Sequence, residues 1–283
     1  MIRRTVEVGG TTVPTFLYGT AWKEDRTYEC VLRALEAGFR GIDTANQRRH
    51  YHEAEVGRAV QDALSGGALQ RTDLFLQTKY TFLPSQDRRL PYDPTAPIAR
   101  QVEQSFSSSL DHLGVETVDS YVLHGPTMRD GLSAADLEAW GAMEALHARG
   151  AVRLLGVSNF TPRQLQMLLS RTKAPLSFVQ NRCYAALGWD AAVRAICDRE
   201  GVVYQGFSLL TANVDVLRGR VVQEIALRHG RLPGQVVFRF ALQIGMIPLT
   251  GTTDPAHMKE DLAVYDFELS DAEVAVIEQA GVR

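Results

Sequence analysis

Short apolar runs alternate with amphipathic helical patterns along almost the whole chain. Eight of the runs are short enough to be strands and are apolar throughout rather than alternating apolar and polar. That character is typical of parallel strands covered on both faces. The predicted strands cover residues 16–19, 41–43, 74–78, 120–123, 153–157, 178–180, 202–205 and 246–249.

The segments between the runs have recognisable helix ends. Apolar residues in 28–35 follow the i, i+3, i+4, i+7 spacing, and Gly38 is a good terminator. Thr161 before Pro162 predicts an N-cap followed by proline at the first helical position. Residues 270–273 form a capping box that predicts the start of a last helix.

Eight strands alternating with helices predict a (β/α)8 TIM barrel, with one domain over residues 1–283. The rival is a doubly wound sheet, which normally shows a Gly-x-Gly-x-x-Gly turn after its first strand. Here the first strand is followed by Gly19-Thr20-Ala21-Trp22. The barrel is therefore favoured.

Composition narrows the function classes. A net charge of -3 gives no field that would attract nucleic acid or an anionic membrane surface. Cys30, Cys183 and Cys197 lack metal-finger or CxxC spacing. No signal-peptide core or membrane-length apolar run is visible. We therefore expect a cytoplasmic protein that needs no metal, membrane, nucleic acid or protein partner.

Polar and ionisable residues follow most of the predicted strands, at the end where a barrel places its chemistry. Burying so many polar groups is costly unless they satisfy one another, so we expect them to converge on one mouth. They are Asp43, Lys79, His124, Ser158-Asn159, Gln180-Asn181, Phe207-Ser208 and Thr250.

Each of these residues also has a simpler interpretation. Asp43 could cap the turn that follows it, Lys79 could lie on the surface beside loop 80–95, and a lone buried His124 is more often structural. Together with Tyr51 they suit a tuned general acid, because a lysine ammonium stabilises tyrosinate and lowers a reference pKa of about 10. A carboxylate would hold the lysine, and a histidine would orient a carbonyl oxygen.

Several motifs follow one another in a specific order and spacing: Gly41-Ile42-Asp43-Thr44-Ala45, Glu53-Ala54-Glu55-Val56-Gly57, Leu76-Gln77-Thr78-Lys79, Asp119 to His124, Gly156-Val157-Ser158-Asn159-Phe160 and Gln180-Asn181. Together they resemble those of the aldo-keto reductases, from about residue 8 to residue 280. The resemblance implies a catalytic tetrad of Asp43, Tyr51, Lys79 and His124, with Tyr51 as the proton donor.

The resemblance also implies a nicotinamide cofactor, with NADPH favoured and NADH left open. Ser158, Asn159 and Gln180 would bind the carboxamide, and Phe207 would stack under the ring. The backbones of Ser208 and Leu210 would meet the pyrophosphate. The other implied cofactor residues are Thr20, Asp43, Gly251, Thr252, His257, Glu260 and Asp261, and the implied substrate-pocket residues are Trp22, Tyr51, Phe82 and His124.

The chain departs from the family pattern in three places. The usual register to Glu53 would put His50 at the tyrosine position, but a similar His-Tyr-x-Glu-Ala stretch in one branch assigns Tyr51. Leu249 and Thr253 stand where basic residues often hold the 2′-phosphate of NADP, and His257 or Lys259 could replace them. The chain stops soon after its last helix, which predicts an open mouth and loose substrate choice.

The predicted function is reduction of aldehydes or ketones to alcohols by hydride transfer from the cofactor, with Tyr51 as general acid. One alternative is a Schiff-base aldolase that uses Lys79 as the nucleophile. Another is a catalytically weak, redox-sensing NAD(P)-binding protein. The sequence leaves open the physiological substrate, the direction of reaction and the oligomeric state.

Overall fold

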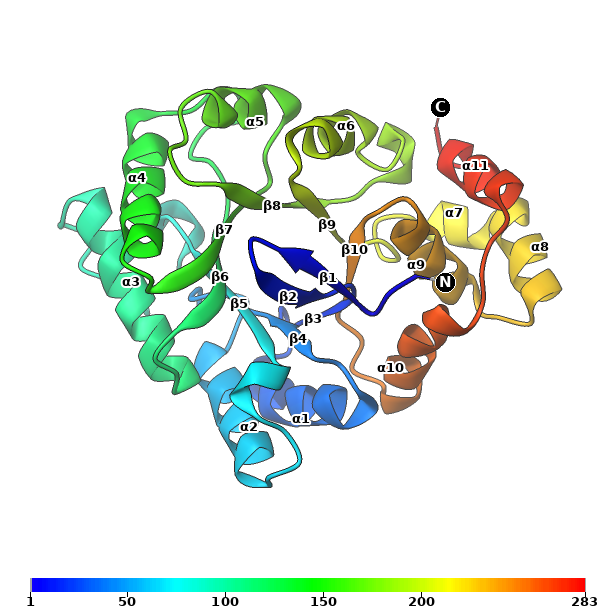
Figure 1. The fold of residues 1–283 in the computed structure, drawn as a ribbon, viewed down its shortest axis with the longest axis horizontal. Coiled ribbons are helices and arrows are strands. Elements are labelled where there is room, and N and C mark those ends of the chain that lie inside the picture. Colours follow the sequence, from blue (N-terminus) through cyan, green and yellow to red (C-terminus); the bar gives the residue numbers. More distant parts are fainter. Residues whose placement is uncertain (1, 283) are drawn as a thin grey trace.

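Eight parallel strands close into a barrel in the computed structural model, which describes residues 2–282 (Figure 1). The strands follow one another around the barrel in chain order, and the last pairs with the first. Each predicted strand overlaps one of them, so the (β/α)8 prediction is confirmed. The barrel strands are β3 (Leu17–Gly19), β4 (Gly41–Asp43), β5 (Phe75–Tyr80), β6 (Val118–Leu123), β7 (Val152–Ser158), β8 (Leu176–Arg182), β9 (Val203–Phe207) and β10 (Ile247–Thr250).

Helices surround the barrel on its outside (Figure 1). One α-helix follows each of β3 to β8, three follow β9, and two follow β10. They are α1 (Thr27–Ala37), α2 (Glu53–Ser65), α3 (Ile98–Leu113), α4 (Ala134–Ala148), α5 (Pro162–Leu169), α6 (Ala191–Glu200), α7 (Val214–Arg218), α8 (Arg220–His229), α9 (Pro233–Gln243), α10 (Pro255–Leu262) and α11 (Asp271–Gln279). Short 3-10 turns are η1 (Glu24–Arg26), η2 (Arg71–Asp73), η3 (Leu83–Ser85), η4 (Ala185–Leu187) and η5 (Ala263–Asp266).

The predicted helix ends are present. The side chains of Thr161 and Ser270 accept hydrogen bonds from the backbone N–H groups of Gln164 and Glu273, which completes a capping box at each helix. Gly38 ends α1 in the left-handed region, at φ 113°, where a residue with a side chain would be strained.

An N-terminal hairpin, β1 (Thr5–Val8) and β2 (Thr11–Pro14), lies across one end of the barrel at the centre of Figure 1. Val13, with Val8 beside it, packs in one cluster with Leu17, Leu154 and Phe178 in the barrel interior. The hairpin therefore closes the end from which the strands start. Any ligand must enter at the opposite end.

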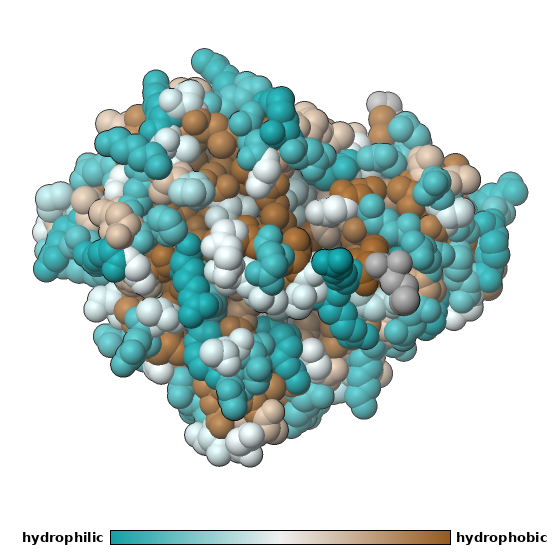
Figure 2. All heavy atoms as spheres, viewed as in Figure 1, coloured by the Kyte–Doolittle hydropathy of each residue, from teal (hydrophilic) through white to brown (hydrophobic). Residues whose placement is uncertain are grey.

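Hydrophilic side chains cover much of the face that carries the hairpin, with smaller apolar patches between them (Figure 2). Within residues 2–282 the helices are all too short or too polar to cross a membrane.

Candidate active site

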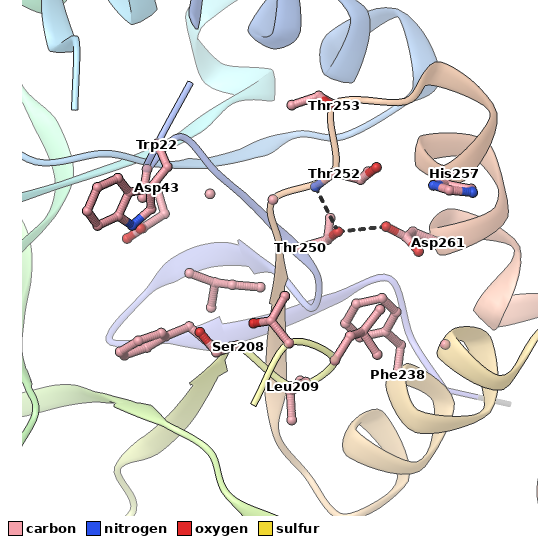
Figure 3. Close-up of a pocket in the computed structure, with 18 of the residues that line it drawn as sticks. Trp22, Asp43, Ser208, Leu209, Phe238, Thr250, Thr252, Thr253, His257 and Asp261 are labelled. Carbon is pink, nitrogen blue, oxygen red and sulfur yellow. Dashed lines mark hydrogen bonds between the residues drawn. The ribbon is translucent and has the colours of Figure 1, made fainter. Parts of the chain in front are cut away.

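An elongated cavity of about 850 Å³ opens at the carboxyl ends of the strands. That volume lies in the range of roughly 300–1,000 Å³ typical of small-molecule and cofactor sites. One end holds Asp43, Tyr51 and His124, and the other reaches α10. Figure 3 shows Trp22 and Asp43 on one side of the cavity and His257 and Asp261 on the other. The strand-end residues thus converge on one opening, as expected.

A buried ion pair lies at the base of this cavity. The Lys79 ammonium donates to both carboxylate oxygens of Asp43, each at 2.7 Å, and to the carbonyl of Thr44 at 2.8 Å. Their side chains are only 1% and 4% exposed. All three donors of the ammonium are therefore used inside the protein, which excludes the surface location considered for Lys79.

Tyr51 lies between the ion pair and His124. The Lys79 ammonium is 5.3 Å from the centre of the Tyr51 ring, and the Tyr51 and His124 rings are 5.7 Å apart. His50 lines the same cavity, but its ring stacks on Trp22 at 3.9 Å. The four side chains of the predicted tetrad therefore gather at one place. This geometry favours Tyr51 over His50 as the residue at the tyrosine position of the tetrad.

The electrostatics of this cluster differ from expectation in one respect. Burial, with Asp43 nearby, raises the pKa of the Tyr51 phenol instead of lowering it. The lowering predicted from the lysine is wrong here because burial of the phenol dominates the shift of its pKa. Burial also lowers the pKa of Lys79, although Asp43 opposes that shift.

His124 is a neutral imidazole at physiological pH. Burial, followed by the charge of Lys79, holds its pKa well below the usual range. Its Nδ1 lies 2.7 Å from the hydroxyl of Thr81, and its ring lines the cavity. A neutral ring held in this way can interact with an uncharged carbonyl oxygen without bringing a second cation beside Lys79.

Of the side chains expected at the carboxamide, Gln180 contacts the ion pair directly. Gln180 donates to Asp43 at 2.9 Å, while Asn159 donates to the Ser158 hydroxyl at 3.0 Å and to the carbonyl of His124 at 2.9 Å. Asn159 adopts φ 60°, an uncommon backbone conformation for a residue with a side chain. Phe207 lines the same cavity from the end of β9.

The far end of the cavity carries hydrogen-bond acceptors. Thr250 donates to Asp261 at 2.7 Å, a contact drawn in Figure 3, and burial raises the pKa of Asp261 to about 6. One buried carboxylate oxygen of Glu260 has no hydrogen-bond partner within residues 2–282. An unpartnered acceptor here and an aromatic ring toward the other end suit an elongated ligand with donor groups, as a dinucleotide has.

Some predicted site residues lie elsewhere. Thr20 is completely buried behind the cavity wall and donates to the carbonyl of Asp43, so its side chain does not reach a ligand. Phe82 and Asn159 line a second cavity of about 440 Å³. His124 borders both cavities, but Phe82 lines only the second one and Asp43 only the first.

Other residues at the site were not predicted. Lys23 is buried in the cavity wall and donates to the carbonyl of Gly251, and burial lowers its pKa. Arg182 lines the cavity from the end of β8. Gln77 and Gln205 lie inside the barrel, next to Asp43 and Gln180. Arg182 directly follows Gln180-Asn181 at a strand end, and this position in the sequence could have identified it as a site residue.

The sequence and fold match one family consistently. A model of the aldo/keto reductase family matches residues 9–281. An aldo-keto reductase of Mycolicibacterium vanbaalenii is 32% identical over 273 residues, which are 94% of this chain and 88% of the relative. An aldo/keto reductase of Brucella melitensis has a crystal structure with a TM-score of 0.82 and 26% identity, covering 99% of this chain and 100% of the other.

A second solved structure, the aldo-keto reductase of Bombyx mori in complex with NADP, has a TM-score of 0.84 and 24% identity over 99% of this chain and 93% of the other. The family match identifies the protein as an oxidoreductase. The chain belongs to the aldo/keto reductase family, as its resemblance indicated.

Proposed function

We propose that the protein reduces an aldehyde or ketone to an alcohol, with Tyr51 as the general acid. The observation that supports this most directly is the position of Tyr51, which lines the cavity between Lys79 and His124. No hydrogen bond within residues 2–282 occupies its hydroxyl, so the group is free to meet a substrate oxygen. A nicotinamide cofactor would supply the hydride.

The raised pKa of Tyr51 suits proton donation in the direction of reduction. A phenol that retains its proton is still a strong enough acid for a developing alkoxide, because an alkoxide is a stronger base than a phenolate. The Lys79 ammonium lies 5.3 Å from the centre of the Tyr51 ring, and Asp43 keeps it in place. His124, neutral and bound to Thr81, would orient the substrate oxygen.

The chain offers residues for each part of a dinucleotide. Gln180, Ser158 and Phe207 line the cavity; the first two would bind the carboxamide, and Phe207 would offer a face for the ring. Lys23 and Arg182 are the cations that line the cavity within residues 2–282, and they are the candidates for the pyrophosphate. We favour NADPH, in line with the NADP complex of the Bombyx mori neighbour, and NADH remains the alternative.

The substrate would be a small carbonyl compound that enters beside Trp22. Trp22 is 69% exposed and leaves the mouth open on that side. The open mouth supports a broad choice of substrates. A cytoplasmic location stays a prediction.

The test is the variant Tyr51→Phe, which keeps the ring and removes only the hydroxyl. We expect reduction of a simple aldehyde to fall by at least about a thousandfold while NADPH binding, measured by quenching of tryptophan fluorescence, is unchanged. The matched control is Tyr28→Phe, because the Tyr28 hydroxyl bonds Asp62 outside the cavity. Full activity in Tyr51→Phe would refute the assignment of the acid. A parallel titration with NADH measures the cofactor preference.

A further inference from the structure

A layer of three glutamines lies inside the barrel beneath the mouth. Gln77, Gln180 and Gln205 come from β5, β8 and β9 and are 0%, 3% and 0% exposed. Strand pairing places Gln77 opposite Asp43 and Gln180 opposite Gln205. Three primary amides in a barrel interior are costly unless all their donors are bonded.

The carboxylate of Asp43 fixes the orientation of two of these amides. Its Oδ1 accepts from Gln77 at 2.7 Å and from Gln180 at 2.9 Å, in addition to the Lys79 ammonium. An ionised carboxylate can only accept hydrogen bonds. Both amides must therefore turn their NH2 groups inward, because the opposite orientation would place an amide oxygen against the carboxylate.

Gln205 then completes the arrangement. Its Oε1 accepts the second N–H of Gln77 at 2.8 Å and of Gln180 at 2.9 Å, and its own NH2 donates to Gln77 Oε1 at 3.2 Å. All amide donors of Gln77 and Gln180 are thereby used. The Oε1 of Gln180 has no donor within residues 2–282, and Gln180 lines the cavity.

We propose that Gln77 and Gln205 are positioning residues that lock the Gln180 amide with its oxygen toward the cavity, so that the site selects a ring substituent that donates N–H. This inference rests on the proposed function. It goes beyond that function in one respect: two residues that do not touch the ligand set the preference for a carboxamide over a substituent that carries only a carbonyl oxygen. Without Gln205 one N–H of Gln180 loses its partner, and only the bond to Asp43 still holds the amide in this orientation.

The experiment compares binding of NADP⁺ and its 3-acetylpyridine analogue by isothermal titration calorimetry. The analogue keeps the carbonyl oxygen and lacks the N–H donors, so the ratio of the two Kd values isolates the Gln180 acceptor. We expect a ratio of about tenfold in the unaltered protein, the size of one lost hydrogen bond. In Gln205→Met, which has a similar length and no amide, we expect the ratio to fall severalfold toward one, because the Gln180 amide keeps only its bond to Asp43.

The matched control is Gln101→Met. Gln101 is also a buried, hydrogen-bonded glutamine but lies outside the cavity, so its loss should leave the ratio at about tenfold. Retention of the ratio in folded Gln205→Met, checked by circular dichroism, would overturn the inference and leave the proposed function intact. If Gln205→Met does not fold, Gln77→Met gives the same test, since it removes the partner that orients Gln205. Failure of the unaltered protein to bind either dinucleotide would overturn both proposals.

Discussion

Replacing Lys79 with methionine tests how strongly the buried ion pair depends on both partners. Methionine keeps most of the volume and removes the ammonium, so the Asp43 carboxylate remains buried with only Gln77 and Gln180 as donors. Removing one partner of a buried pair costs about 3–5 kcal/mol, because the other charge is left uncompensated. The low exposure of both side chains places this pair in that class.

The assay is equilibrium urea unfolding at pH 7, followed by circular dichroism. A loss of about 4 kcal/mol divided by a denaturant slope of about 3 kcal/mol per molar predicts that the midpoint falls by about 1 M or more.

The double variant Asp43→Asn with Lys79→Met separates charge from packing. It leaves a neutral amide in place of the lone carboxylate, so we expect it to be more stable than Lys79→Met alone. As a control, Arg100→Met breaks an exposed pair with Glu103 and should leave the midpoint unchanged. A midpoint for Lys79→Met equal to that of the unaltered protein, or a double variant no more stable than the single one, would refute the reasoning.

Two further predictions concern other parts of the fold. Gly57→Ala should lower the free energy of unfolding by at least about 1–3 kcal/mol, measured by thermal or urea unfolding. The reason is that the added Cβ would lie 1.9 Å from the carbonyl oxygen of His112. Unchanged stability of this variant would contradict the close approach of α2 and α3. Asp261→Asn should stabilise the protein at pH 8 by on the order of 2 kcal/mol and have little effect at pH 4. The direction of this effect follows from the raised pKa of the Asp261 carboxyl in the folded protein. Its contribution to stability is fully present below the pKa of the unfolded chain, near 4, and is lost as the pH rises through about 6. Equal stability of Asp261→Asn and the unaltered protein at pH 8 would contradict this account.

The barrel was predictable because its signal repeats. Eight apolar runs separated by helices with ordinary caps fit few other folds, and a single misread boundary changes nothing. The N-terminal hairpin was missed although its signal is present. Gly9-Gly10 joins the two strands, and both glycines adopt positive φ, 54° and 77°, as a two-residue hairpin turn requires.

The site residues at strand ends could be predicted from the sequence, whereas those contributed by loops could not. Asp43, Lys79 and His124 end or follow strands, so the topology alone brings them together. Lys23 lies in a loop, and nothing in the local pattern indicates that its ammonium reaches Gly251. Thr20 also follows a strand, yet its hydroxyl turns to the backbone of Asp43.

The interior glutamines had a signal of a different kind. Side chains two residues apart on a strand face the same side, so Gln77 must face inward if Lys79 does, and Gln205 must do so if Phe207 does. A polar residue two positions before a mouth residue thus predicts a second polar layer behind the site. Lower in the barrel, Leu154 and Phe178 fill an apolar layer under the hairpin. The barrel interior is therefore divided along its axis, with packing that stabilises the fold at one end and hydrogen bonds that orient the ion pair at the other.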